Sequence, residues 1–276
     1  MNRKEIAQLT VRFMEQGFYE YNGRRVDFTA AQKHSEESSV LITPQEGAGI
    51  VKEWSGKQPP QRQAELTVGN MATMKVILDF AQSGLKQVGV LNFASAKNPG
   101  GGFLRGTMAQ EESLAASSGL YGTLIRHEEY YQANRMFKSM MYTDHAIYSP
   151  DVVFFRDERF ELIEQPVTAS VLTLPAVNYG EVLKKGEDAV RACQVMKERM
   201  RLALAIFAQR GDKNLILGAY GCGVFRNDPI KVAAWWQELL AEEGYGAYFD
   251  RIVFAVLDGS KTQSCIVAFE KQFSKK

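Results

Sequence analysis

The residues best suited to chemistry in this chain are two adjacent glutamates, Glu111 and Glu112. A glutamate carboxyl group can donate and accept a proton, which makes each of them a candidate general acid or base. The pair follows a glycine-rich segment, and glycine lets a backbone approach a ligand with no side chain in the way. Seven residues separate three consecutive glycines from the residue before the pair, in the order Gly100, Gly101, Gly102 and then Gln110. This arrangement favours a carboxyl group working beside a bound ligand.

Two glycine-rich segments, residues 94–103 and 220–227, each follow a predicted strand and precede a predicted helix. Thr107 and Gln110 fit a capping box at the first helix, and Asp228 with Pro229 suits the start of the second. Backbone N–H groups at a helix N-terminus favour an anion, so both loops suit a phosphate or a diphosphate. Neither loop is a P-loop, and the dinucleotide fingerprint GxGxxG is absent.

Strands and helices that alternate along the chain must position these loops. Short apolar runs predict buried strands at 88–93, 167–174, 215–219 and 252–257. Helical patterns lie at 71–82, 111–125, 186–209 and 229–243, while 126–166 is less regular. Alternation of this kind predicts an α/β fold with a mixed, largely parallel sheet, in which ligands bind beyond the carboxyl ends of the strands.

The first 60 residues have a different pattern. Residues 3–16 predict a helix, Asn22-Gly23 predicts the turn of a hairpin over 18–28, and 40–42 predict a short strand. We therefore expect an N-terminal extension over 1–60, packed on a catalytic domain over 61–276.

Composition excludes several classes of protein. The 33 basic and 32 acidic side chains nearly cancel, so phosphate recognition must come from a local site, and we expect no specific DNA binding. The cysteines Cys193, Cys222 and Cys265 are odd in number and widely spaced, which indicates a reducing compartment. Without a signal-peptide core or a long apolar run we expect a cytoplasmic protein with no membrane contact. The scattered histidines predict no metal site, and we expect no cofactor.

The combined pattern resembles a known family. The run from Asn92-Phe93-Ala94 through Asn98-Pro99 and the three glycines to Gln110-Glu111-Glu112 is similar to the signature of poly(ADP-ribose) glycohydrolases of the bacterial type. The second loop is similar to that family's diphosphate-binding loop. The likeness covers residues 61–276, with weaker support before them. It implies a macrodomain-like three-layer α/β/α sandwich, with poly(ADP-ribose) or an ADP-ribosylated protein as partner and ADP-ribose as product.

The resemblance also implies roles for individual residues. Glu112 is similar to the family's catalytic acid, and Glu111 would hold hydroxyls of the ribose next to the scissile bond. Gln110 would support the pair, Asn98 would bind the distal ribose, and Phe225 would pack against it. The other substrate-binding residues implied are Gly100, Gly101, Gly102, Gly221, Cys222, Gly223, Val224 and Asn178.

The bond to be broken is an O-glycosidic link between two riboses, which implies an oxocarbenium-like transition state. Glu111 and Glu112 point about 100° apart on a helix, so they do not suit the opposed carboxylates of many glycosidases. We therefore expect Glu112 to act alone as acid and then base. Because a helix N-terminus favours the charged carboxylate, we expect Glu112 to become a competent acid once substrate is bound.

Two alternatives share the fold. A non-catalytic ADP-ribose-binding macrodomain would not need the Gln-Glu-Glu triplet, which argues against it. A hydrolase for mono-ADP-ribosyl groups would need a similar cleft, and the sequence leaves it open. We expect cleavage from chain ends if the extension closes one side of the ribose.

Overall fold

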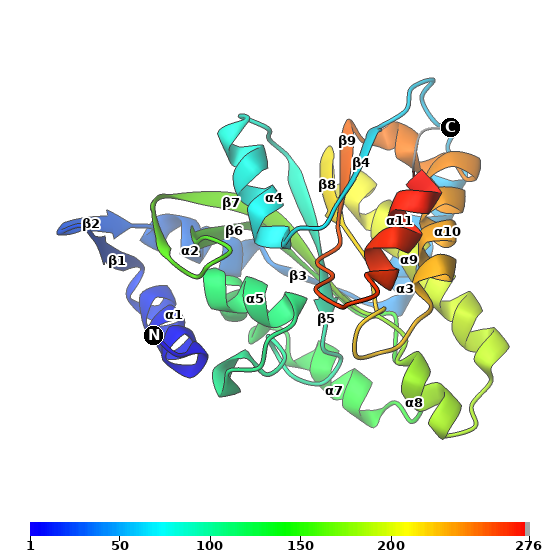
Figure 1. The fold of residues 1–276 in the computed structure, drawn as a ribbon, viewed down its shortest axis with the longest axis horizontal. Helices are drawn as coiled ribbons and strands as arrows, with labels where there is room; N and C mark the ends of the chain where they lie inside the picture. The colour runs from blue at the N-terminus through cyan, green and yellow to red at the C-terminus, as the bar shows by residue number, and fades with distance from the viewer. Residues whose placement is uncertain (274–276) are drawn as a thin grey trace.

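A seven-stranded sheet with the strand order β3-β6-β7-β5-β8-β9-β4 crosses the middle of the computed structural model, which describes residues 1–273 (Figure 1). Its strands are β3 (Val40–Ile42), β4 (Glu65–Gly69), β5 (Val88–Ala94), β6 (Ala146–Arg156), β7 (Leu162–Pro175), β8 (Asn214–Leu217) and β9 (Arg251–Ala255). The β7-β5-β8-β9-β4 part is parallel, whereas β6 pairs antiparallel with β7 and β3. The predicted mixed, largely parallel sheet is confirmed.

Helices cover both faces of this sheet, because successive strand residues point to opposite sides. On β5, Val88 and Val90 pack toward α4 (Thr73–Gln82), α5 (Gln110–Ser117), α6 (Leu120–Leu124) and α7 (Glu128–Met136). Leu91 packs toward the other layer, which contains α3 (Pro44–Ser55), α9 (Ala189–Arg210), α10 (Pro229–Gln237) and α11 (Ser264–Phe273). The short α8 (Tyr179–Lys184) precedes α9. The result is the expected three-layer α/β/α sandwich.

The predicted helix over 111–125 is interrupted in the structure. Ser118 adopts an extended conformation that ends α5, and Gly119 N donates to Val153 O of β6. This contact with the sheet replaces the helical hydrogen bonds and starts the separate helix α6.

Strand β6 lies within the segment that looked irregular in the sequence. The strand carries a bulge between Ser149 and Val152, where Asp151 has a φ of 47°. The bulge breaks the alternation of apolar residues and hides the strand from pattern-based reasoning.

The helix, the hairpin and the short strand predicted before residue 60 are present, and the first helix contacts the predicted catalytic helix. The helices over 29–38 and 44–55 were not predicted. Helix α1 (Arg3–Gln16) is followed by the hairpin β1 (Phe18–Tyr21) and β2 (Arg24–Asp27), then α2 (Thr29–Ser38) and β3. Thr10 of α1 donates to Ala116 O of α5 at 2.6 Å, and Ile6 packs against Phe103 and Ala115. Because β3 pairs with β6, these residues also supply an edge strand of the main sheet. The domain boundary near residue 60 stays a prediction.

None of the helices in residues 1–273 combines the length and apolar character needed to cross a membrane.

Close packing of α9 on β5 generates a stability prediction. A Cβ at Gly89 would lie 2.7 Å from the Phe207 ring and 3.0 Å from Asp212 Cγ. We expect Gly89→Ala to lower the free energy of unfolding by about 1–3 kcal/mol, measured by urea denaturation. Gly49→Ala is the matched control, since a Cβ there meets nothing within 4 Å and alanine favours helix α3 by about 0.5–1 kcal/mol. Equal effects of the two substitutions would contradict this view of the packing.

Candidate active site

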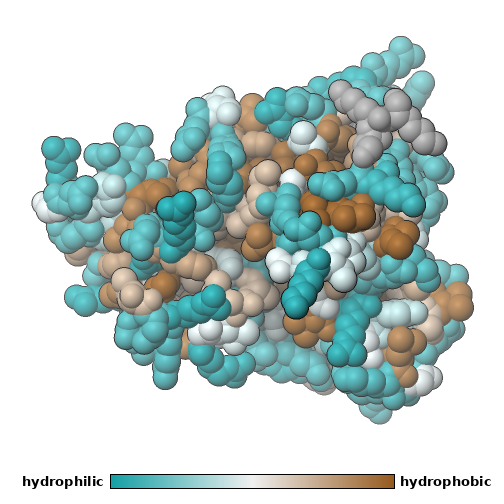
Figure 2. Space-filling model, viewed as in Figure 1, coloured by the Kyte–Doolittle hydropathy of each residue, from teal (hydrophilic) through white to brown (hydrophobic). Residues whose placement is uncertain are grey.

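The two glycine loops meet at one edge of the sheet. Strands β5, β7, β8 and β9 are parallel, so their carboxyl ends lie side by side and the segments after them converge (Figure 1). Helix α5 begins at this edge, next to the end of β5, with which it makes contact. Figure 2 shows the molecule in the same view, with hydrophobic and near-neutral residues over its middle and hydrophilic side chains around and between them.

Gln110 attaches the start of α5 to β5. Its Oε1 accepts from Phe93 N at 2.9 Å, and its Nε2 donates to Leu91 O at 2.9 Å. The pairing of β5 with β8 stops at Val90, so the glutamine amide takes the place of a neighbouring strand. The predicted capping box between Thr107 and Gln110 is therefore wrong. Ala109 is the N-cap residue of α5, and its methyl group cannot make a capping bond. The Gln110 side chain binds the strand instead of the N-cap residue.

Glu111 attaches α5 to the beginning of the first glycine loop. Its Oε2 accepts from Ser95 N at 2.6 Å, and its Oε1 accepts from Asn92 Nδ2 at 3.3 Å. The residue is only 3% exposed, and this burial raises the pKa of its carboxyl group to about 8. Glu111 is therefore mostly neutral at pH 7 in the absence of ligand.

Glu112 attaches α5 to the end of the same loop. Its Oε1 accepts from Gly102 N at 3.0 Å, and the residue is 8% exposed. A Cβ at Gly101 would lie 2.9 Å from Glu112 Cδ and 3.1 Å from Glu111 Oε2, and Gly101 has a φ of 61°. Although the two side chains leave the helix in different directions, their carboxyl groups converge on the Gly101 backbone. Only glycine fits this position.

Two further groups hold the rest of the first loop, namely the Ser95 side chain within the loop and Arg135 of α7. Ser95 Oγ accepts from Asn98 N at 3.1 Å, which leaves the Asn98 side chain exposed at the rim. Arg135 of α7 donates twice to Lys97 O, at 2.9 and 2.6 Å. The loop is therefore fixed before any ligand arrives.

The second loop is held by Asn227, which is buried. Its Nδ2 donates to Val177 O at 2.8 Å and to Gly221 O at 3.0 Å, so it ties the loop to the segment after β7. Phe225 is half-buried in this loop, whereas Gly223 and Val224 are exposed. As expected, Asp228 caps α10 by accepting from Ile230 N, with proline in the first turn.

Cys222 and Asn178 have structural partners. Burial raises the pKa of the Cys222 thiol well above its usual value, and the thiol donates to Tyr220 O. A thiol in this state is a poor nucleophile. The Asn178 side chain caps α8 by accepting from Glu181 N at 3.3 Å.

Several residues of the site escaped sequence reasoning. Asn92 and Ser95 hold Glu111, and Asn227 holds the second loop, but none of the three has a charged or strongly reactive side chain. Asn92 left one signal, because it is a polar residue inside an otherwise apolar strand.

Together the sandwich fold, the two glycine loops and the buried carboxyl groups define a macrodomain-like protein with its site at the carboxyl edge of the sheet. Residues 7–157 match the family described as microbial-type PARG, catalytic domain, where PARG stands for poly(ADP-ribose) glycohydrolase. The chain belongs to this family.

Solved structures agree with this assignment. The PARG from Thermomonospora curvata is 35% identical, with a TM-score of 0.93 over 98% of this chain and 99% of that one. The same enzyme bound to the inhibitor ADP-HPD gives 34% identity and a TM-score of 0.91 over the same shares. The PARG from Deinococcus radiodurans in complex with ADP-ribose is 38% identical, with a TM-score of 0.82 over 88% of this chain and 96% of that one. A comparison with curated protein sequences gave no match.

The raised pKa of Glu111 generates a prediction about pH. Between the ordinary carboxyl pKa of 4.5 and about 8, the folded protein holds a proton on Glu111 that the unfolded chain has lost. Stability should therefore fall as pH rises through this window, by at most about 1.4 kcal/mol per pH unit. Glu111→Gln keeps an acceptor for Ser95 N but cannot titrate, so the variant should gain stability relative to wild type from pH 5 to pH 8.

Urea denaturation across this range measures the difference between the two proteins. Asp212, whose pKa burial raises to about 7, titrates in both and cancels in the comparison. Parallel pH profiles for wild type and Glu111→Gln would show that Glu111 is charged in the folded protein.

Proposed function

We propose that this glycohydrolase cleaves the ribose–ribose O-glycosidic bond of poly(ADP-ribose) with Glu112 as its single acid and base. Membership of the PARG family makes the chain a glycosidase that acts on poly(ADP-ribose) and releases ADP-ribose. The observation that carries the role of Glu112 is its position. Its carboxyl group lies against the Gly101 backbone and accepts from Gly102 N, inside the first glycine loop.

In this reaction Glu112 first donates one proton to the substrate and later takes one proton from water. Glu112 donates a proton to the departing 2′-oxygen as the bond between that oxygen and the anomeric carbon breaks. The oxocarbenium ion that forms is attacked by water, and Glu112 takes the proton that the water loses. The substrate's own diphosphate, held by the backbone of the second loop, stabilises the positive charge.

Glu112 must carry a proton when the reaction starts, because its first step is to donate one. A negative charge on Glu111 would help Glu112 to keep its proton, but Glu111 is mostly neutral at pH 7. In this proposal the bound diphosphate and the exclusion of water keep the proton on Glu112. Glu112 therefore becomes a competent acid when the substrate binds.

The other residues bind and orient the substrate in this proposal. Asn98 contacts the distal ribose from the rim of the first loop, and Phe225 packs against the same ribose from the second loop. Glu111 holds ribose hydroxyls with the acceptor capacity left over from Ser95 and Asn92. The diphosphate is cradled by backbone groups of Gly100, Gly101 and Gly102 and of Gly221, Cys222, Gly223 and Val224, with Asn178 beside them.

The central test is the release of free ADP-ribose from purified poly(ADP-ribose), followed by liquid chromatography. We expect Glu112→Gln to lower the rate by about 10²–10⁴-fold, while its affinity for ADP-ribose stays within a few-fold of wild type. Glu129→Gln is the matched control, since Glu129 is an exposed first-turn glutamate of α7 and should leave the rate unchanged. Full activity of Glu112→Gln would remove Glu112 from the mechanism. No release by either protein, with tight ADP-ribose binding by both, would favour a binding module or a different linkage.

We also propose that cleavage proceeds from chain ends, because α1 of the N-terminal residues packs directly on α5 and on the segment after the glycine loop. Free ADP-ribose should then be the main early product from long polymer, while the remaining chains shorten gradually. Gel analysis that finds long internal oligomers early in the digestion would contradict this proposal.

A further inference from the structure

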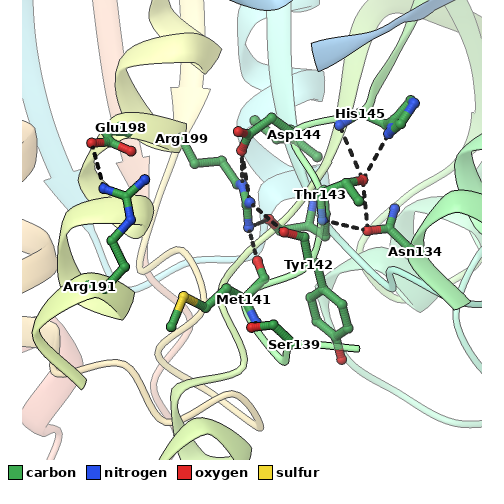
Figure 3. Close-up of polar contacts among 12 residues, drawn as sticks. Asn134, Ser139, Met141, Tyr142, Thr143, Asp144, His145, Arg191, Glu198 and Arg199 are labelled. Carbon is green, nitrogen blue, oxygen red and sulfur yellow. Dashed lines mark hydrogen bonds and ion pairs between the residues drawn. The ribbon is translucent and has the colours of Figure 1, made fainter. Parts of the chain in front are cut away.

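Arg199 is a buried cation below the edge of the sheet where the site lies. It comes from the middle of α9 and is only 1% exposed. Its guanidinium donates to the carbonyl oxygens of Met141 at 2.7 Å, Pro175 at 3.0 Å and Tyr142 at 3.3 Å, and to the Asp144 carboxylate at 2.8 Å (Figure 3). It therefore joins the end of β7 to the segment before β6. A guanidinium suits this task because its planar fork reaches several acceptors at once.

The segment that Arg199 holds contains a strained aromatic residue. Tyr142 has a φ of 58°, a strained conformation that a bulky side chain adopts only where its surroundings impose it. The surroundings here are Arg199 on the Tyr142 carbonyl and Asn134 of α7, which accepts from Thr143 N at 2.9 Å. Figure 3 shows the Tyr142 ring pointing away from the guanidinium.

The strained conformation directs the Tyr142 ring toward the second glycine loop. Its centroid lies 6.0 Å from that of Phe225, with the rings tilted by 45°. The backbone on either side is tied as well, since Asn178 N donates to Met140 O and Gly180 N donates to Phe225 O, both at 3.0 Å. Tyr142 is thus a buried support behind the half-buried Phe225.

We propose that Arg199 and Tyr142 are positioning residues that hold the Phe225 ring in place for the substrate ribose. Arg199 imposes the backbone conformation of Tyr142, and the Tyr142 ring restricts the orientation of Phe225. This inference rests on the proposed role of Phe225 in packing against the distal ribose.

A double-mutant cycle of Tyr142→Ala and Phe225→Ala tests the inference. If Tyr142 acts through Phe225, each single substitution should lower kcat/KM for poly(ADP-ribose) by about tenfold, and the double variant should be no worse than Phe225→Ala. Losses that multiply in the double variant, or an unchanged kcat/KM in Tyr142→Ala, would overturn the inference.

The four proteins of this cycle are also compared by their dissociation constants for ADP-ribose, measured by calorimetry. If wild type binds ADP-ribose but does not hydrolyse the polymer, the proposed function fails while the coupling of Tyr142 and Phe225 is still tested. Non-additive losses in affinity would support the inference, and additive losses would overturn it.

Tyr142→Gly separates positioning from folding. Glycine accepts a φ of 58° without strain, so this variant should fold at least as readily as Tyr142→Ala and still lose the support of Phe225. Its kcat/KM should fall as in Tyr142→Ala. Full activity in a well-folded Tyr142→Gly would overturn the inference.

Phe160→Ala is the matched control. Phe160 is also an aromatic residue with positive φ, at 66°, and its carbonyl accepts from a buried arginine, Arg156, at 2.9 Å. It lies in the connection between β6 and β7, away from Phe225. It should lose stability without the coupling to Phe225→Ala that Tyr142→Ala shows.

Arg199→Lys tests the first step, because a lysine keeps the charge but cannot span all four acceptors. We expect a loss of kcat/KM of about tenfold that disappears when it is measured in the Phe225→Ala background. A loss that persists in that background would show that Arg199 does not act through Phe225, and would overturn its part in the inference.

Discussion

The attachment of the α5 N-terminus to the backbone of β5 and its loop is the interaction on which the site depends. Three successive side chains take part, and each one binds a different part of that backbone: Gln110 the strand, Glu111 the start of the loop and Glu112 its end. Both carboxyl groups thereby lose water and converge on a position where only glycine fits. The glycine loop and the catalytic pair are thus one structural unit, in which the groups that shape the loop are also those proposed to do the chemistry.

The remaining elements bring a second loop to this unit. Parallel pairing sets the ends of β5, β7 and β8 at one edge, and Asn227 ties the loop after β8 to the segment after β7. Arg199, inside the protein, ties the segment before β6 to the end of β7. Buried polar groups with several partners are costly to leave unpaired, so such contacts favour one arrangement of the loops over all others. A site that must align a ribose between two loops needs this rigidity, because small displacements of reacting groups cost rate.

Sequence reasoning located β5, β8, β9 and most of β7, the helices α1, α4, α9 and α10, and both loops, because continuous apolar runs and glycine-rich turns depend on local residues. It did not find β4, α2 or α3. It failed where tertiary contacts decide. Ser118 ends α5 through a contact with β6, the bulge at Asp151 conceals a strand, and the Gln110 side chain binds β5 instead of capping its own helix. The glutamate pair could be found from its position after the glycines. Its burial, its convergence on Gly101 and the contacts that Glu111 makes with Asn92 and Ser95 depend on tertiary packing, which no local pattern reveals.

Glu112 has both a structural bond to Gly102 and a proposed chemical role, so loss of activity on its removal has two explanations. An aryl ADP-ribose with an acidic nitrophenol leaving group distinguishes them, because such a group departs without receiving a proton. The most direct measurement is therefore the ratio of wild-type to Glu112→Gln rates on poly(ADP-ribose) and on this aryl substrate. If Glu112 is the acid, the ratio should fall from about 10²–10⁴ on the polymer to within about tenfold on the aryl substrate. Equal losses on both substrates would show that Glu112 does not contribute by protonating the leaving oxygen, and would contradict the account.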